Sequence, residues 1–270
     1  MKRTAKSQLR NLDVRPSKKR GQNFLIDSMV LDQIIAIGKP ESAKKIVEIG
    51  PGLGALTERL AALPVPTVAI EIESKLAAEI SSRFPAVQVV NMDILQADLK
   101  EFGGELVVFG NIPYSISTDI VFHLLENRSV IDKAILMVQR EFAQRMAAAP
   151  GSKQYGSLSV AVQLYCECEA GPVVPGSSFH PPANVDSQII ALKFSATPRF
   201  DVPDPRWFER VVRASFHQRR KMLANSLRSL GSKSQEEING ALARASIDGT
   251  RRAETLSIEE FATLANELAG

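Results

Sequence analysis

Five short apolar runs are separated by segments of helical spacing in the first half of the chain. The runs cover residues 45–50, 67–73, 87–93, 105–111 and 133–139. Runs that are apolar at nearly every position are typical of parallel strands buried on both faces. The segments GALTERLAALP, SKLAAEISSRFP and STDIVFHLLEN between them repeat apolar residues at the spacing of a helix. Strands that alternate with helices in this way predict a doubly wound, Rossmann-like α/β sheet.

The flanking segments extend this pattern. DSMVLDQIIAIG predicts a helix that starts at Asp27 or Ser28 and stops at Gly38. SLSVAVQLY predicts another helix, and CECEAGPVV and SQIIALKF predict strands, the later one antiparallel to the rest. Three prolines within residues 195–205 mark a boundary, beyond which every pattern is helical. We therefore predict a basic tail over 1–20, an α/β domain over 21–197 and a small all-helical domain over 198–270.

The basic residues are gathered at two places, although the net charge of the 270-residue chain is only +3. Residues 1–20 hold eight Lys and Arg against one Asp. The second cluster consists of Arg206, Arg210, Arg213, Arg219, Arg220, Lys221 and Arg228. Two basic clusters on a nearly neutral chain suggest a polyanionic partner, with a solvated tail and a solvated helix face as the alternative.

Cysteine and histidine usage argues against disulfides and metal. Cys166 and Cys168 stand in a C-x-C pair that closes a disulfide only with difficulty, and the three histidines have no ligand spacing. We predict reduced thiols in a cytoplasmic protein without a metal. The apolar runs are all shorter than a membrane span, so we expect no membrane partner.

Polar residues and glycines follow successive predicted strands. Gly50, Gly52 and Gly54 form a turn that lets a ligand approach the backbone, although a merely tight turn has the same composition. Glu71 ends the second run, about 20 residues on, where a carboxylate can accept both ribose hydroxyls. Glu73 is a rival for this role.

Asp93 ends the third run, where it could accept a hydrogen bond from an adenine amino group or cap a helix. Glycines, a ribose acid and an adenine partner together predict an adenosine site. NAD and S-adenosylmethionine both fit such a site, and the fourth run distinguishes them.

The fourth run ends in NIPY, which suits methylation of an amino group. An adenine N6 is a poor nucleophile that needs orientation rather than a base. The Asn111 side-chain oxygen and the carbonyl of Ile112 or Pro113 can each accept one N6 hydrogen, and Tyr114 can stack on the base. A strand-ending turn is the alternative. Ligands of open α/β sheets bind at these strand ends, which favours the site.

These motifs together resemble the ribosomal RNA adenine N6,N6-dimethyltransferase family over roughly residues 18–230. The resemblance is carried, in order, by KKRGQNFLID, VEIGPGLGALT, IEIE, NMDIL, NIPYSIST, FHPPANVDS and FHQRRKMLANSL. It implies a class I methyltransferase fold that uses S-adenosylmethionine. The family often has Leu where this chain has Ile112, which is a conservative change.

The resemblance also implies residue roles. It places the methyl donor against Asn23, Leu25, Gly50, Gly52, Glu71, Asp93 and Asn111, with Gln22 and Phe24 lining the pocket. It places the target adenine beside Asn111 and Pro113, between Tyr114 and a second aromatic, Phe179, for which a core role is the alternative. Phosphate contacts are expected from the N-terminal tail and from Arg219, Arg220 and Lys221, which could instead form a solvated helix face.

The helical C-terminal region and the length resemble the small-subunit enzyme. The implied substrate is the pair of adjacent adenosines in the 3′-terminal hairpin loop of small-subunit rRNA, within a ribosomal subunit precursor, and each would receive two methyl groups. We expect a monomer. The alternatives are an assembly-checkpoint factor whose catalysis is secondary, a large-subunit rRNA methylase and, more distantly, a dinucleotide-dependent dehydrogenase.

Overall fold

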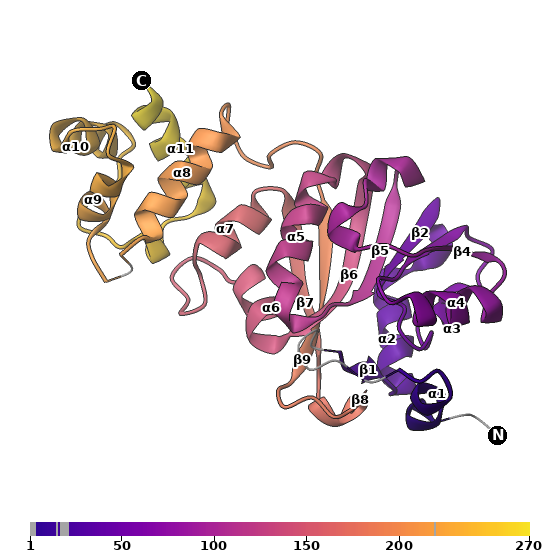
Figure 1. The fold of residues 1–270 in the computed structure, drawn as a ribbon. Helices are drawn as coiled ribbons and strands as arrows, with labels where there is room; N and C mark the ends of the chain where they lie inside the picture. The colour runs from indigo at the N-terminus through magenta and orange to yellow at the C-terminus, as the bar shows by residue number, and fades with distance from the viewer. Residues whose placement is uncertain (1–3, 15, 17–21, 219) are drawn as a thin grey trace. The chain divides into compact units, whose positions relative to one another are not determined.

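The computed structural model of the protein describes residues 4–14, 16, 22–218 and 220–270. The chain forms two compact units, described separately here. The first comprises Met1–Ala143 with Glu167–Ala196, and the second comprises Gln144–Cys166 with Thr197–Gly270. Figure 1 shows the elements of both units along the chain.

The first unit is built on a seven-stranded sheet with the order β4-β3-β2-β5-β6-β9-β7. The neighbouring strands from β4 to β6 pair in parallel, and β9 pairs with β6 antiparallel. These strands are β2 (Lys45–Ile49), β3 (Thr67–Ile70), β4 (Val87–Val90), β5 (Leu106–Asn111), β6 (Ile131–Gln139), β7 (Cys166–Val174) and β9 (Ser187–Phe194). All five predicted apolar runs are thus strands, and the late antiparallel strand is confirmed.

A second, two-stranded sheet joins distant segments of this unit. β1 (Phe24–Leu25) pairs antiparallel with β8 (Phe179–His180), with Leu25 opposite Phe179. Ile26 continues the contact by donating its backbone N–H to the Ser178 carbonyl at 2.9 Å. This pairing fixes residues 24–26 to the segment that precedes β9.

The helices of the first unit are α1 (Ala5–Asn11), α2 (Ser28–Gly38), α3 (Thr57–Leu60), α4 (Ser74–Arg83) and α5 (Ser117–Glu126), and α6 (Arg140–Met146) spans the junction of the units. α1 lies within the predicted basic tail, where Leu9 is buried against Phe24, Leu53 and Leu76. The described part of the tail is therefore more than a solvated arm.

One predicted helix is wrong in length, and another is confirmed. The helix expected over GALTERLAALP is reduced to the single turn of α3, because Gly54 at φ +78° holds the preceding residues in turns. α2 does begin after an Asp27 cap, whose carboxylate accepts from the Met29 N–H. At its other end it stops at Gly38, as predicted, and the C-cap residue Lys39 adopts the left-handed conformation, at φ +43°. The absence of a side chain at Gly38 also makes room for Phe109, which packs against it.

The order of the strands reverses between β2 and β5. Connections from β2 run outward through β3 to β4, whereas β5 and β6 lie on the other side of β2. At such a reversal the loops after the two central strands diverge and leave a crevice at their carboxyl ends. The loops after β2, β3, β4 and β5 therefore gather at one edge of the sheet.

The second unit is helical, with α7 (Ser157–Gln163), α8 (Pro205–Phe216), α9 (Leu223–Ser226), α10 (Gln235–Arg244) and α11 (Ile258–Ala269). Its core includes Tyr155, Val160 and Leu164 together with Phe208 and Phe261. The sequence predicts that residues 144–166 belong to the α/β domain, whereas they cluster with the second unit and several of their apolar side chains are buried in this helical core. Among the helices that the structure describes, none has the length and apolar character needed to cross a bilayer.

The contact between Gly38 and Phe109 generates a test of the packing. A Cβ atom at Gly38 would lie 2.4 Å from the Phe109 ring, which is fully buried on β5 and has no room to move. We expect Gly38→Ala to lower the free energy of unfolding by about 1–3 kcal/mol in urea denaturation. Gly104→Ala, where the added carbon meets no described atom within 4 Å, is the matched control. Equal stability of the two variants would contradict this packing.

Candidate active site

A cavity of about 600 Å³ opens at the carboxyl ends of the central strands. It is lined by nine of the predicted site residues: Asn23, Leu25, Gly50, Gly52, Glu71, Asp93, Asn111, Pro113 and Tyr114. Gln22 and Phe24 line it as well. The structure thus brings together segments from the N-terminal strand and from four successive strand ends.

The glycine turn forms one wall of this cavity. A side chain at Gly50 would point into space that the described residues leave open, and Gly50 has a φ of +64°. A Cβ atom at Gly52 would meet the Phe24 ring at 2.9 Å, so glycine there allows the N-terminal strand to approach. Gly54 has a different role. A Cβ atom there would meet the side chains of Ile80 in α4 and Phe84 directly after it, so glycine allows this helix to pack closely.

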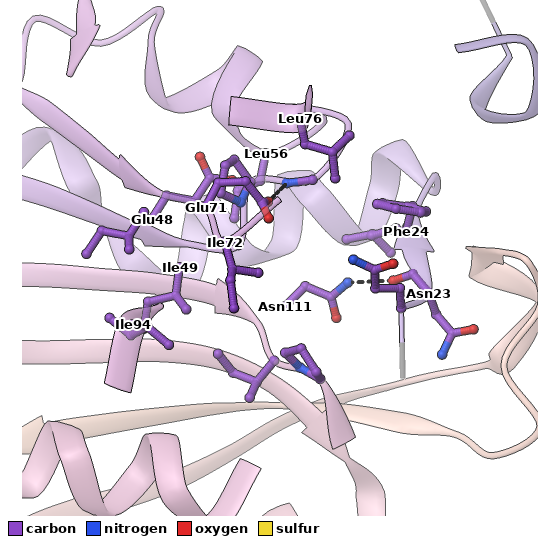
Figure 2. Close-up of a pocket in the computed structure, with 18 of the residues that line it drawn as sticks. Asn23, Phe24, Glu48, Ile49, Leu56, Glu71, Ile72, Leu76, Ile94 and Asn111 are labelled. Carbon is purple, nitrogen blue, oxygen red and sulfur yellow. Dashed lines mark hydrogen bonds between the residues drawn. The ribbon is translucent and has the colours of Figure 1, made fainter. Parts of the chain in front are cut away.

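Glu71 connects the glycine turn to the end of β3. Its two carboxylate oxygens accept the N–H groups of Gly52 at 3.1 Å and of Glu73 at 2.9 Å. Burial raises the pKa of Glu71, and these backbone amides oppose that rise. Glu71 lines the cavity, whereas its rival Glu73 precedes α4 outside the lining. Figure 2 shows Glu71 pointing toward the turn.

Asp93 serves as a cap and as part of the cavity wall. Its Oδ1 atom accepts from the Leu95 N–H at 3.0 Å, at the start of the 3₁₀ helix η2 (Ile94–Gln96). The alternative of a helix cap is therefore correct for this oxygen. The carboxylate also lines the cavity, so the two roles are compatible.

Glu48 is a buried acid at the cavity that the sequence reasoning missed. It lies on β2 with 2% of its surface exposed, and its Oε2 atom has no hydrogen-bond partner in the described part of the chain. Burial, with a contribution from the Glu71 charge, raises the pKa of Glu48 to about 8. At neutral pH the group is thus a carboxylic acid. Its place in an apolar strand gave no separate signal in the sequence.

The amide of Asn111 is held in one orientation. Its Nδ2 atom donates to the backbone carbonyl of Asn23 at 2.9 Å. This bond fixes which end of the amide carries the oxygen, and it leaves that oxygen available as an acceptor. Figure 2 shows this bond between the end of β5 and the N-terminal segment.

The residues after Asn111 are fixed by further hydrogen bonds. The Pro113 carbonyl accepts both the Ile116 N–H at 3.2 Å and the Ser117 hydroxyl at 3.0 Å. Tyr114 begins the 3₁₀ helix η4 (Tyr114–Ile116), and its Oη lies 2.7 Å from the Oγ of Ser187 on β9. Burial raises the pKa of the Tyr114 phenol, so it is neutral in the physiological range.

Two groups of predicted site residues lie elsewhere. Phe179 is 1% exposed and belongs to the hydrophobic core beside Val30 and Ile34, which places its ring outside the cavity lining. The core alternative thus describes its surroundings, and its backbone pairing with Leu25 gives it a supporting place under the site. Arg220 and Lys221 are exposed in the second unit, and Arg219 lies outside the described residues.

Apolar side chains complete the walls. Ile72, Leu76 and Ile94 line the cavity, and Ile72 is 51% exposed despite its size. They follow the acids at the ends of β3 and β4, where a flat heterocycle could lie between isoleucines. A sequence signal existed in Ile72 and Ile94, since each stands directly after a predicted ligand-binding position.

The fold and the site define a class. A reversal point in a parallel sheet, a glycine turn, a ribose-type acid at the next strand and an oriented amide at the fourth strand are the features of a class I methyltransferase. The sequence model of the family described as ribosomal RNA adenine dimethylase matches residues 15–270. The chain therefore belongs to the ribosomal RNA adenine dimethylase family, which uses S-adenosylmethionine.

Curated relatives and solved structures agree with this assignment. The chain is 43% identical over 259 residues to ribosomal RNA small subunit methyltransferase A of Clostridioides difficile, covering 93% of this chain and 90% of that protein. It is 45% identical over 264 residues to the protein of that name from Bacillus mycoides, with the same coverage.

Two crystal structures are similar over most of the chain. A dimethyladenosine transferase from Plasmodium falciparum gives a TM-score of 0.77 at 27% identity, covering 89% of this chain and 95% of that one. The 23S rRNA methyltransferase ErmE gives 0.72 at 27% identity, covering 92% and 100%.

The proton on Glu48 makes stability depend on pH. Between pH 4.5 and about 8 the folded protein holds a proton that the unfolded chain has released, so stability falls as pH rises through this window. One such group contributes a slope of up to about 1.4 kcal/mol per pH unit. We expect Glu48→Gln to flatten the pH dependence of the free energy of unfolding, measured in urea. Glu58→Gln, an exposed acid, should retain the slope of the unmodified protein; identical slopes in all three would refute the buried proton.

Proposed function

We propose that this protein transfers methyl groups from S-adenosylmethionine to N6 of two adjacent adenosines in the 3′-terminal hairpin loop of small-subunit rRNA, giving dimethyladenosines. The family, and relatives named for the small subunit at 43% and 45% identity, support this substrate. The observation that carries the mechanism is the oriented Asn111 amide in the lining of the cavity.

The donor side is supported by three features of the chain. Gly50 leaves the backbone open to the methionine part, Glu71 lines the cavity where a ribose would lie, and Ile72 and Ile94 can enclose an adenine. Bound there, S-adenosylmethionine supplies a methyl group on a positively charged sulfur. The residues that line the cavity therefore suit this donor, and the reaction that we propose uses no metal ion.

On the acceptor side, two oxygens orient the target amino group. Asn111 Oδ1 accepts one N6 hydrogen, and the bond from Asn111 Nδ2 to the Asn23 carbonyl keeps the amide in this orientation. The second acceptor is the Ile112 carbonyl, since both lone pairs of the Pro113 carbonyl are used by Ile116 and Ser117. Two acceptors draw the N6 nitrogen toward tetrahedral geometry and aim its lone pair at the methyl group, without deprotonation.

Tyr114 provides the stacking surface for the target base. Its ring is half-buried at the cavity, and base–aromatic stacking contributes roughly 1–3 kcal/mol. Loop adenosines are partly unstacked, which lowers the cost of presenting one to this ring. Phe179 has a structural role in this scheme. It lies on β8, which pairs with β1, the strand that directly follows Asn23.

The RNA is proposed to contact the second unit through exposed cations. Arg220 and Lys221 follow α8, whose own outward residues include Arg210 and Arg213. Phosphate contacts of this kind add affinity without reading sequence. We further propose that the protein acts as a cytoplasmic monomer on a ribosomal subunit precursor.

The role of Asn111 can be tested directly. Asn111→Ala removes the side-chain acceptor, and we expect methyl transfer to immature small subunits to fall at least a hundredfold, in the range found when an oriented oxyanion donor is removed. Asn127→Ala is the matched control, because Asn127 also donates its amide to a backbone carbonyl, that of His123, far from the cavity lining. Full activity of the Asn111 variant in a labelled-methyl assay would refute the mechanism.

The phosphate contacts predict a change in salt dependence. In the double variant Arg220→Gln, Lys221→Gln, the slope of log affinity for small subunits against log salt should become shallower by about two, roughly one unit per phosphate contact. Arg244→Gln is the control, because Arg244 is paired with Glu267 at 2.6 Å in the same unit. An unchanged slope in the double variant would show that these cations face solvent only.

A further inference from the structure

A buried hydroxyl reaches the acceptor side of the site from β9. Ser187, the last residue of the FHPPANVDS motif, is 0% exposed and lies opposite Gln139 of β6 in the sheet register. Its Oγ is 2.7 Å from the Tyr114 Oη. The neighbouring residue Asp186 is tied to Arg140, whose backbone N–H donates to the Asp186 carbonyl at 3.0 Å. The first residue of β9 is thus held in place by its pairing with β6 and by the adjacent bond to Arg140.

This bond gives the Tyr114 ring a second anchor. The backbone of Tyr114 is held in η4, immediately after β5, and the far end of its ring is held on β9. A ring attached only through its Cβ atom turns about two side-chain torsions. The Oη atom lies on the axis of the Cβ–Cγ bond, so its bond to a fully buried serine fixes the direction in which the ring extends from η4.

The two methyl transfers place different demands on this ring. In each transfer the N6 lone pair forms the new N–C bond, the electron pair of the broken S–C bond stays on sulfur, and N6 loses one proton to water. Before the first transfer N6 has two hydrogens, one for Asn111 Oδ1 and one for the Ile112 carbonyl. Before the second transfer it has one hydrogen, so one acceptor has lost its partner. Stacking on Tyr114 then carries a larger share of the orientation.

We propose that Ser187 is a positioning residue that fixes the Tyr114 ring through its hydroxyl and thereby sustains the second methyl transfer to the same N6. The inference rests on the proposed function and names a residue specific to its second step. Ser187 acts through Tyr114 and does not itself contact the base.

The test is the ratio of N6-monomethyladenosine to N6,N6-dimethyladenosine. Small subunits from a strain lacking this protein are incubated with S-adenosylmethionine and the unmodified protein, Ser187→Ala, Tyr114→Phe or the double variant, and the nucleosides are quantified by mass spectrometry over time. Loss of one neutral hydrogen bond should raise the ratio roughly two- to tenfold in Ser187→Ala. Tyr114→Phe breaks the same bond from its other end and should raise the ratio similarly. The double variant should be no worse than the single ones.

Thr67→Val is the control for loss of a buried hydroxyl. Thr67 is 4% exposed at the opposite end of β3, and its hydroxyl donates to the Val65 carbonyl. This variant should keep the product ratio of the unmodified protein whatever its melting temperature. A merely structural Ser187 would lower stability and both transfers together, leaving the ratio unchanged.

The outcomes separate the inference from the function beneath it. An unmodified protein that forms neither product refutes the proposed function. Dimethylation with an unchanged ratio in Ser187→Ala, or with additive effects of Ser187→Ala and Tyr114→Phe, overturns the inference and leaves the function standing. If Ser187→Ala does not fold, an unchanged ratio in Tyr114→Phe alone overturns it.

Discussion

The parallel pairing of β2 with β5 is the constraint on which the site depends. Ile49 lies opposite Gly110 in this pair, so the glycine turn and Asn111 leave the sheet side by side although about sixty residues separate them in the sequence. On one side β3 leads to Glu71, and on the other side β9 supplies Ser187, whose hydroxyl is bonded to that of Tyr114. A methyl donor and a methyl acceptor have to meet within bonding distance. Two adjacent parallel strands whose following loops turn to opposite sides of the sheet hold the two binding segments at that distance.

Electrostatics complements this geometry on the donor side. Two acids, Glu48 and Glu71, lie close together in a site for a cationic ligand, and burial opposes charging either of them. Glu71 receives two backbone N–H groups that favour its ionised form, while Glu48 has a carboxyl oxygen that no described group satisfies. Burial therefore keeps Glu48 a neutral carboxylic acid at neutral pH, whereas the two backbone N–H groups at Glu71 oppose the rise of its pKa. In the proposed reaction, Glu71 is thus the acid of the two that is better suited to meet a cationic donor.

The sequence predicted the parts of the site that are local to strand ends. Glu71, Asp93 and Asn111 each follow an apolar run, and the pleat and the common direction of parallel strands carry them to one edge. Features that depend on contacts between distant segments were not predictable in this way. The core burial of Phe179 follows from its pairing with Leu25, and the hydroxyl of Ser187 matters only because β9 folds back beside β6.

The same limit applies to the domain boundary and to local helix length. The boundary near residue 197 was visible in the prolines, but the membership of 144–166 depended on which core receives Tyr155 and Leu164. The helix after the glycine turn was overextended because its apolar spacing is helical, whereas the left-handed glycine at 54 keeps its first residues in turns. The spacing of apolar residues shows which face of a helix is buried, but it does not show at which residue the backbone can start a helix.

The assignment of one acceptor to the Ile112 carbonyl has an evolutionary consequence. A main-chain oxygen is present in every residue type, so the side chain at position 112 is free to vary among those that fill its buried space without altering the reaction. Position 111 lacks that freedom, since its oxygen belongs to the side chain and its amide nitrogen must also reach the Asn23 carbonyl. In the proposed mechanism, two neighbouring residues that each accept one N6 hydrogen thus tolerate substitution very differently.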